Sequence, residues 1–435
     1  MKKKIILFLL IFNILASVFA QKQDFDKKSE DKYQVQNGNL VIVGGGLKSD
    51  NSDVYNKFIE LAGGKENAII AILPTASASP QESLDNFKNN LIKYGVISEN
   101  IHFIEVATID DSSTPDIDES KWIKNSNEKK YCEILSKCTG VWFVGGDQMR
   151  ITKALYNEDG SNSEVLNSIW KIYNNKGVIG GTSAGAAIMS YAMIAAGTSY
   201  GALSQGITTD YYGTEQQENG PLFFSTGLGF FNHSVVDQHF DAKARIGRLV
   251  VAAMNVKDSI SLCYGIDENT AIIVYGTENK IEVLGTGSLT IVNTSKAKIT
   301  KNGEYYNYEN IILSNIEGGD IYYYEKNIFE INKIKSLTTG NEYFNIPTPV
   351  QSGILVSYPT FKDLITINLI DNSGTKEVVS YSFDSSMTGF KFVFSKYEET
   401  LGYWTNEPDG NNHYSAINVL CNIYPVKIKI EDIKQ

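Results

Sequence analysis

A serine flanked by glycines is the residue of this sequence that is best placed to act as a nucleophile. Residues 181–185 read Gly-Thr-Ser-Ala-Gly, which matches the G-x-S-x-G pattern of a nucleophile elbow centred on Ser183. The apolar run 177–179 predicts a short buried strand, and the small residues after the serine predict a helix that starts near Ala184. On the turn between them the Ser183 hydroxyl would be lifted clear of a sheet, as nucleophilic attack on a carbonyl requires.

A serine hydroxyl needs a base within hydrogen-bond reach, and the sequence offers four histidines. His239 is the favoured base because it follows the apolar run 230–236 and precedes a polar, basic cluster, as expected where a buried strand emerges at a sheet edge. We interpret His102 and His413 as structural side chains, and His233 as a core or supporting residue. The pair Ser183 and His239 therefore predicts a serine hydrolase.

A third strand end supports this interpretation. The apolar run 141–144 leads into Gly145, Gly146, Asp147 and Gln148. Bare backbone amides at such a turn can bind a developing oxyanion, and the Gln148 amide can hydrogen-bond a substrate.

Four motifs in a fixed order carry a family resemblance: Gly-Gly-Asp-Gln at 145–148, Gly-Thr-Ser-Ala-Gly-Ala at 181–186, Asp-Gln-His-Phe at 237–240 and Gly-Ile-Asp-Glu-Asn-Thr-Ala at 265–271. This set resembles the cyanophycinase family of serine peptidases, relatives of the aspartyl dipeptidases with a class I glutamine amidotransferase-like fold. Segments 40–46 and 72–77 agree with it, and the resemblance covers roughly residues 38–325.

The resemblance implies that Ser183 is the nucleophile, that His239 is its general base, and that amides of Gly146 and Ala184 form the oxyanion hole. It implies a substrate such as cyanophycin, a poly-aspartate chain with arginine on each β-carboxyl, cleaved to β-aspartyl-arginine through an acyl-enzyme. It also suggests a homodimer. The substrate-binding residues that it implies are Gln148, Asp237, Gln238, Lys243, Arg245 and Arg248.

The sequence departs from the family pattern at two places. Lys243 stands where the family has arginine, so a carboxylate contact there would lose the planar fork of a guanidinium. The family also has an acidic triad member about a helix length after the serine, but residues 195–201 here contain no carboxylate. Glu268 or Asp210 would then be the orienting acid, and Asp237 is a further candidate.

Two alternatives stay open at this stage. One is a diverged aspartyl-specific peptidase that acts on short peptides. The other is a non-catalytic secreted binding protein that keeps the fold and works through its C-terminal module.

Composition excludes some function classes. The chain has 435 residues, 42% of them hydrophobic, and a formal net charge of −11, which argues against nucleic-acid binding. The four cysteines show no Cys-x-x-Cys spacing, which argues against a structural zinc. We expect no metal and no cofactor, because the chemistry of a serine hydrolase needs neither.

The N-terminus predicts export. Three lysines at 2–4 precede the apolar run 5–12, and Val-Phe-Ala at 18–20 offers a cleavage site. We therefore expect a signal peptide over 1–20, a flexible lead-in over 21–37, and a secreted or periplasmic mature protein without a membrane anchor.

The remaining chain predicts an α/β fold with two parts. Over 38–325, apolar runs alternate with amphipathic segments, such as a helix from Ser163 to Asn174, which favours a mainly parallel sheet with helices on both faces. Residues 326–435 predict a smaller β-rich C-terminal module of unknown role, with strands expected at 364–370, 378–383 and 390–394.

Overall fold

The computed structural model describes residues 37–231, 234–347, 350–355, 360–406, 412–429 and 431–432. The predicted signal peptide, nearly all of the lead-in, and His233 lie outside the described residues. Within these ranges, no helix combines the length and the apolar character needed to cross a membrane.

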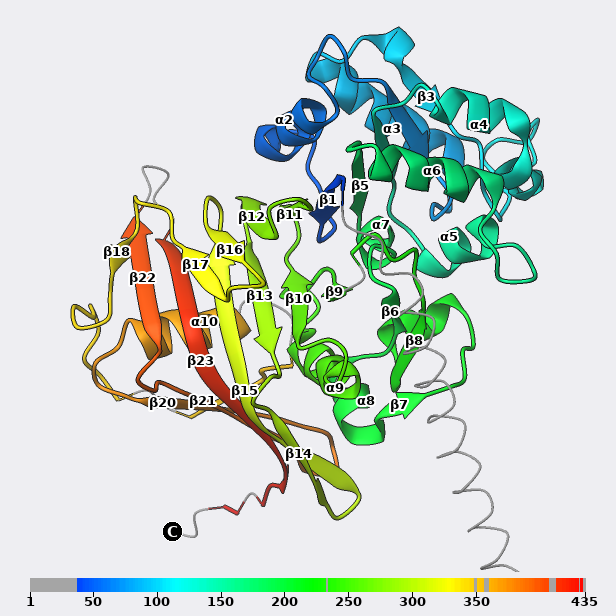
Figure 1. Cartoon of the computed structure of the whole chain (residues 1–435). Helices are drawn as coiled ribbons and strands as arrows, with labels where there is room; N and C mark the ends of the chain where they lie inside the picture. Colours follow the sequence, from blue (N-terminus) through cyan, green and yellow to red (C-terminus); the bar gives the residue numbers. More distant parts are fainter. Residues whose placement is uncertain are drawn as a thin grey trace, which may run out of the picture.

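The first sheet runs in the order β17-β16-β12-β11-β1-β5-β4-β2-β3. In Figure 1 its strands β1, β5 and β3 lie toward the upper right, whereas β12, β16 and β17 lie beside the second sheet. Its strands β1, β5, β4, β2 and β3 are mutually parallel, whereas β11, β12, β16 and β17 are antiparallel to their neighbours. The strands are β1 (Asn39–Val43), β2 (Ile70–Leu73), β3 (Ile101–Phe103), β4 (Gly140–Phe143), β5 (Val178–Thr182), β11 (Thr270–Tyr275), β12 (Lys280–Gly285), β16 (Ile321–Tyr323) and β17 (Ile328–Glu330).

Helices cover both faces of this sheet, as predicted. Successive side chains of β1 point to opposite faces. Leu40 and Ile42 pack with α4, α5, α6 and α7, whereas Val41 and Val43 pack with α2 and α3. These helices are α2 (Ser52–Leu61), α3 (Pro80–Lys93), α4 (Lys129–Leu135), α5 (Gln148–Leu155), α6 (Glu164–Asn174) and α7 (Ala184–Ala187).

The second sheet contains most of the C-terminal residues, in the order β19-β20-β21-β23-β15-β13-β10-β9, with β14, β18 and β22 paired at its margins. Its strands are β9 (Val235–Asp237), β10 (Leu262–Ile266), β13 (Ser288–Asn293), β14 (Lys298–Asn302), β15 (Tyr305–Glu317), β18 (Ser336–Leu337), β19 (Gln351–Ser352), β20 (Glu377–Phe383), β21 (Thr388–Ser395), β22 (Leu401–Asn406) and β23 (Asn412–Lys427). The region after residue 326 is β-rich, as predicted, but β17 joins the first sheet, and the later strands share the second sheet with β9, β10, β13 and β15.

A small third sheet, β6-β8-β7, lies beside α8 and α9 (Figure 1). Its strands are β6 (Ala192–Ala196), β7 (Ile207–Thr208) and β8 (Leu222–Thr226). The remaining helical segments are α8 (Ser199–Gln205), α9 (Ile246–Val256), α10 (Thr360–Ile365), the short turns η1 (Ser98–Asn100), η2 (Glu119–Asn127) and η3 (Thr214–Glu218), and the wide helical turn η4 (Thr366–Ile370).

One element differs from its prediction. The apolar run 364–370 was expected as a strand, but it forms the end of α10 and all of η4. Leu364, Ile365, Leu369 and Ile370 are buried against the second sheet. A short apolar run is compatible with either a strand or a helix when only the sequence is known. Here its apolar side chains pack on the face of the second sheet as a helix.

Candidate active site

Ser183 occupies a tight turn between β5 and α7. Its φ of 55° lies in the left-handed region, and its N–H donates to the Val43 carbonyl at 3.0 Å. The turn is close-packed, since a Cβ on Gly181 would lie 2.5 Å from the Gly185 carbonyl oxygen, and one on Gly185 would lie 2.4 Å from the Phe143 oxygen. Glycine at both positions therefore lets strand, turn and helix approach as a nucleophile elbow requires.

His239 meets Ser183 from the second sheet. It follows β9, the last strand of that sheet, and the loop turns sharply because the φ of His239 is 47°. Its Nε2 lies 2.8 Å from the Ser183 hydroxyl oxygen. The structure thus brings together the two residues that sequence spacing singled out.

Glu268 completes the chain of contacts. Its Oε1 lies 2.6 Å from His239 Nδ1. Glu268 sits where the chain crosses from β10 in the second sheet to β11 in the first. Of the acids considered from sequence, Asp210 is exposed in a loop with Tyr212, so it is not the acid that contacts the imidazole. Glu268, one of the candidates from sequence, thus makes this contact, although it lies 85 positions after Ser183 in the chain (268 − 183).

The loop after β1 forms the wall behind this triad. His239 N–H donates to the Gly44 carbonyl at 2.5 Å. A Cβ on Gly45, whose φ is +105°, would lie 2.3 Å from His239 Cε1, and one on Gly46 would lie 3.3 Å from the Glu268 side chain. No role for these glycines was predicted from sequence, although three successive glycines after a buried strand were the available signal.

Asn269 fixes the same loop next to the acid. Its N–H donates to the Gly45 carbonyl at 2.8 Å, and its side-chain oxygen accepts from Lys48 N–H at 3.0 Å. The Asn51 amide donates to both the main-chain and side-chain oxygens of Asn269, each at 2.9 Å. These hydrogen bonds could not be predicted from sequence, because the residues that they join lie more than 200 positions apart in the chain.

The electrostatics suit a neutral imidazole. Burial lowers the pKa of His239 below its ordinary value of 6.5, and the cations of Arg245 and Lys243 act in the same direction. The hydrogen bond to Glu268 opposes the effect. His239 is therefore available as a proton acceptor at neutral pH.

The turn predicted to supply an oxyanion-hole amide lies against the nucleophile. A Cβ on Gly145 would be 3.3 Å from Ser183 Cβ. Gly146 has a φ of +139°, and a Cβ there would lie 2.0 Å from the Ala76 carbonyl oxygen. Ala184 is the first residue of α7, where N–H groups have no acceptor within the helix. Ala184 thus directly follows Ser183, and Gly146 directly follows the glycine that lies against it.

Three residues predicted to bind substrate are engaged inside the protein. The Gln148 amide nitrogen donates to the Ile194 and Ala195 carbonyls at 3.3 and 3.0 Å. Asp237 is 1% exposed and forms a two-pronged ion pair with Arg248, at 2.8 and 2.6 Å. The Gln148 side chain joins α5 to β6, and the Asp237–Arg248 pair joins β9 to α9.

The other three lie nearer the nucleophile or the rim. Gln238 Oε1 is 3.5 Å from the Ser183 hydroxyl oxygen. Lys243 and Arg245 converge on Glu218 of η3, at 2.5 and 2.9 Å. Arg245 is buried, but Lys243 and Glu218 are 38% and 49% exposed, so opposite charges meet at the edge of the site.

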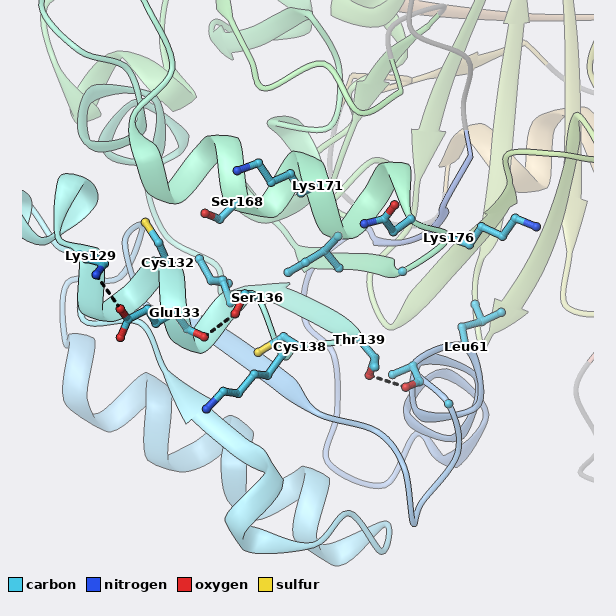
Figure 2. A pocket seen from close by; sticks show the side chains of 17 residues that line it. Leu61, Lys129, Cys132, Glu133, Ser136, Cys138, Thr139, Ser168, Lys171 and Lys176 are labelled. Carbon is cyan, nitrogen blue, oxygen red and sulfur yellow. Dashed lines mark hydrogen bonds and ion pairs between the residues drawn. The ribbon is translucent and has the colours of Figure 1, made fainter.

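A separate pocket of about 850 Å³ lies at the other edge of the first sheet (Figure 2). It is lined by α4, α6 and the residues before β4 and β5, such as Thr139 and Gly177, whereas Ser183 follows the carboxyl end of β5. Lys129 and Glu133 pair across one helical turn there. Burial raises the pKa of the lining Cys138 thiol to about 12, so that thiol is not a nucleophile.

A sequence model of peptidase family S51 matches residues 40–282, which is more than half of the chain. A cyanophycinase from Geminocystis herdmanii is 29% identical over 286 residues, covering 66% of this chain and 91% of that protein. A cyanophycinase from a Nostoc species is 30% identical over 259 residues, covering 59% and 74%. Among solved structures, a peptidase from an acI-B1 Actinobacterium is 20% identical with a TM-score of 0.41, covering 59% of this chain and 91% of that one.

Proposed function

This chain belongs to peptidase family S51 and is a serine-type peptidase, and from that premise we propose that it hydrolyses cyanophycin through an acyl-enzyme on Ser183. The observation that carries the proposal is the unbroken series of contacts from the Ser183 hydroxyl through His239 to Glu268, at 2.8 and 2.6 Å. This is the arrangement that an activated serine nucleophile needs.

In the proposed reaction, Ser183, His239 and Glu268 each have one role. Ser183 attacks the scissile carbonyl as its proton moves to His239 Nε2, and Glu268 holds the imidazole by accepting from Nδ1–H. N–H groups at Gly146 and Ala184 stabilise the oxyanion. His239 then protonates the leaving amine, and a water molecule releases the acyl group by the reverse transfers.

The charges at the rim support an arginine-bearing aspartyl substrate. Glu218 can receive a guanidinium group, and Lys243 can receive a carboxylate, because both side chains are partly exposed. The charge of Lys243 also acts on His239. The two side chains pair with one another in the absence of ligand. A substrate that carries both a guanidinium group and a carboxylate would replace the Glu218–Lys243 pair with one contact to each of these two side chains.

The alternative substrate class is a short peptide with an aspartyl residue at the scissile bond. It is favoured by Lys243, which offers a point charge rather than the planar fork of the arginine that the resemblance implies.

The test compares the purified protein with Ser183→Ala and Glu268→Gln on cyanophycin. We expect β-aspartyl-arginine from the parent, none above background from Ser183→Ala, and a kcat about 10²- to 10⁴-fold lower in Glu268→Gln. An inert parent whose Ser183 still reacts with a fluorophosphonate would favour the short-peptide alternative. An inert parent that is not labelled would overturn the proposal.

Export and assembly are part of the proposal. The N-terminal pattern over 1–20 supports secretion with cleavage before Gln21. N-terminal sequencing of the protein recovered outside the cytoplasm checks this, and light scattering checks the suggested homodimer.

A further inference from the structure

The loop that carries His239 packs against a part of the chain beyond the family match, which ends at residue 282. Phe240 directly follows His239, is buried, and meets the ring of Phe361 edge-on at 6.3 Å between centroids. Phe361 belongs to α10 and packs in turn on Phe394 of β21, at 5.9 Å. The C-terminal region therefore supports the residue next to the proposed base.

Two acidic residues lie beside the proposed base and acid, and one of them links the two loops. Asp241 lies two residues after His239, and Asp267 directly precedes Glu268. Asp267 Oδ1 accepts from the Asp241 N–H at 3.1 Å, so one hydrogen bond joins the two loops. Asp267 Oδ2 accepts from the N–H and hydroxyl of Ser288, at 2.9 and 2.6 Å.

This pair of acids carries an electrostatic cost that α10 offsets. Burial raises the pKa of both carboxyls, that of Asp241 to about 7, and Asp267 and Asp363 add repulsion at Asp241. The cation that faces both is Lys362, which acts to lower each pKa. Its ammonium group also forms an ion pair with Glu317, which is 2% exposed.

Glu317 in turn anchors the ammonium group to the second sheet. Its Oε2 accepts from the Tyr414 N–H at 3.0 Å and lies 3.2 Å from His413 Nδ1. Glu317 ends β15, and Tyr414 lies in β23, so Lys362 connects the middle of that sheet to the catalytic loops.

We propose that Lys362 is a positioning residue for the active site, whose ammonium group balances Asp241 and Asp267 and so keeps the loops of His239 and Glu268 aligned. The inference rests on the proposed function. It gives the C-terminal region a role as part of the catalytic scaffold. Without Lys362, Asp241 and Asp267 repel each other at the hydrogen bond from the Asp241 N–H to the Asp267 carboxylate, which joins the two loops.

The experiment uses the full protein and three variants: Lys362→Met, Lys362→Arg and Lys335→Met. Lys335 is the matched control, because it is another lysine of the C-terminal region that pairs with a buried carboxylate, that of Asp320 at 2.8 Å. Two readouts are followed: the rate at which a fluorophosphonate labels Ser183, and the far-downfield proton resonance of the His239–Glu268 hydrogen bond.

We expect Lys362→Met to lower the labelling rate on the order of 100-fold and to weaken the downfield resonance, since small misplacements of a catalytic group cost this much. Lys362→Arg keeps the charge and should restore most of both signals. Lys335→Met should lose thermal stability while keeping the labelling rate of its folded fraction.

Equal labelling of folded Lys362→Met and Lys335→Met, with an unchanged resonance, would overturn the inference. If Lys362→Met does not fold, Asp241→Asn combined with Lys362→Met is the decisive variant, because removing both charges should recover the resonance. A third outcome separates the two proposals. If the parent protein is never labelled, but its downfield resonance is lost in Lys362→Met, the proposed function is refuted and the positioning role stands.

Discussion

Ser183 and His239 both adopt left-handed backbone conformations, with φ of 55° and 47°. Each such residue costs about 1–3 kcal/mol and persists only where the surroundings hold it. Their N–H groups donate to consecutive carbonyls, those of Val43 and Gly44 at the end of β1. The end of β1 therefore positions nucleophile and base relative to each other, although it contributes no reactive side chain.

The first residue-scale prediction concerns Gly45. Gly45→Ala should lower kcat by about 100-fold, because the added Cβ would overlap the His239 ring and displace it. Gly64→Ala is the matched control, since Gly64 also has a positive φ, +81°, but nothing lies within 4 Å of its Cβ position. Fluorophosphonate labelling of both variants is the measurement, and parental labelling of Gly45→Ala would contradict this account.

The second concerns pH. His239 accepts a proton only when neutral, and its pKa is lowered below 6.5, so activity should persist below pH 6.5 and fall as the pH drops through the lowered pKa. Lys243→Met removes a cation that disfavours protonation, and it should move the midpoint of the acid limb upward. The pH dependence of Ser183 labelling measures both, and a midpoint above 6.5 in the parent would refute the assignment.

At the scale of elements, buried charges join β9 to α9. Arg248 in α9 binds Asp237 at the end of β9, and its remaining nitrogen donates to the Gly197 carbonyl at 2.6 Å. This pair fixes the strand from which the His239 loop departs. A polar cluster after a strand thus proved to be part of the scaffold, although its sequence pattern is equally compatible with substrate binding.

Arg248→Met should lower the free energy of unfolding by about 3–5 kcal/mol, because it leaves Asp237 buried without its main partner. Lys243→Met, which breaks a pair at the rim, should cost only about 0–1 kcal/mol. Urea denaturation measures both. A raised KM with unchanged stability in Arg248→Met would instead support a substrate-binding role.

At the scale of the whole molecule, the two sheets are interleaved along the chain. After β15 in the second sheet, β16 and β17 return to the first, and later strands rejoin the second. The strand β23 lies between β21 and β15, inside the sheet that also carries β9 and β10. The C-terminal region therefore shares its hydrogen bonding and its core with the strands that lead to the active site.

A chain that ends at residue 325 should consequently fail to give a soluble, labelled protein, because it leaves the 13-residue strand β15 without its partner β23. A chain that begins at residue 37 serves as the control and should behave like the parent. Size-exclusion chromatography with fluorophosphonate labelling distinguishes them. A soluble, active 38–325 fragment would show that the predicted boundary separates an independent catalytic domain.

The sequence alone determined the local features of this protein. The elbow at Ser183, the helix that begins after its cap Ser163, and the alternation of strands and helices follow from short-range rules on glycine, capping and apolar period. Ser183 and His239, the proposed nucleophile and base, were identifiable because each lies just after a strand that the sequence pattern indicates.

Only the tertiary structure decided which acid meets His239, because Glu268 approaches through a crossing between two sheets that no local pattern encodes. The same holds for Gly45, for the internal pairing of Asp237 with Arg248, and for the helical form of residues 364–370. Each depends on contacts between segments that fold side by side, and such contacts are set by the packing of complete sheets rather than by neighbouring residues in the chain.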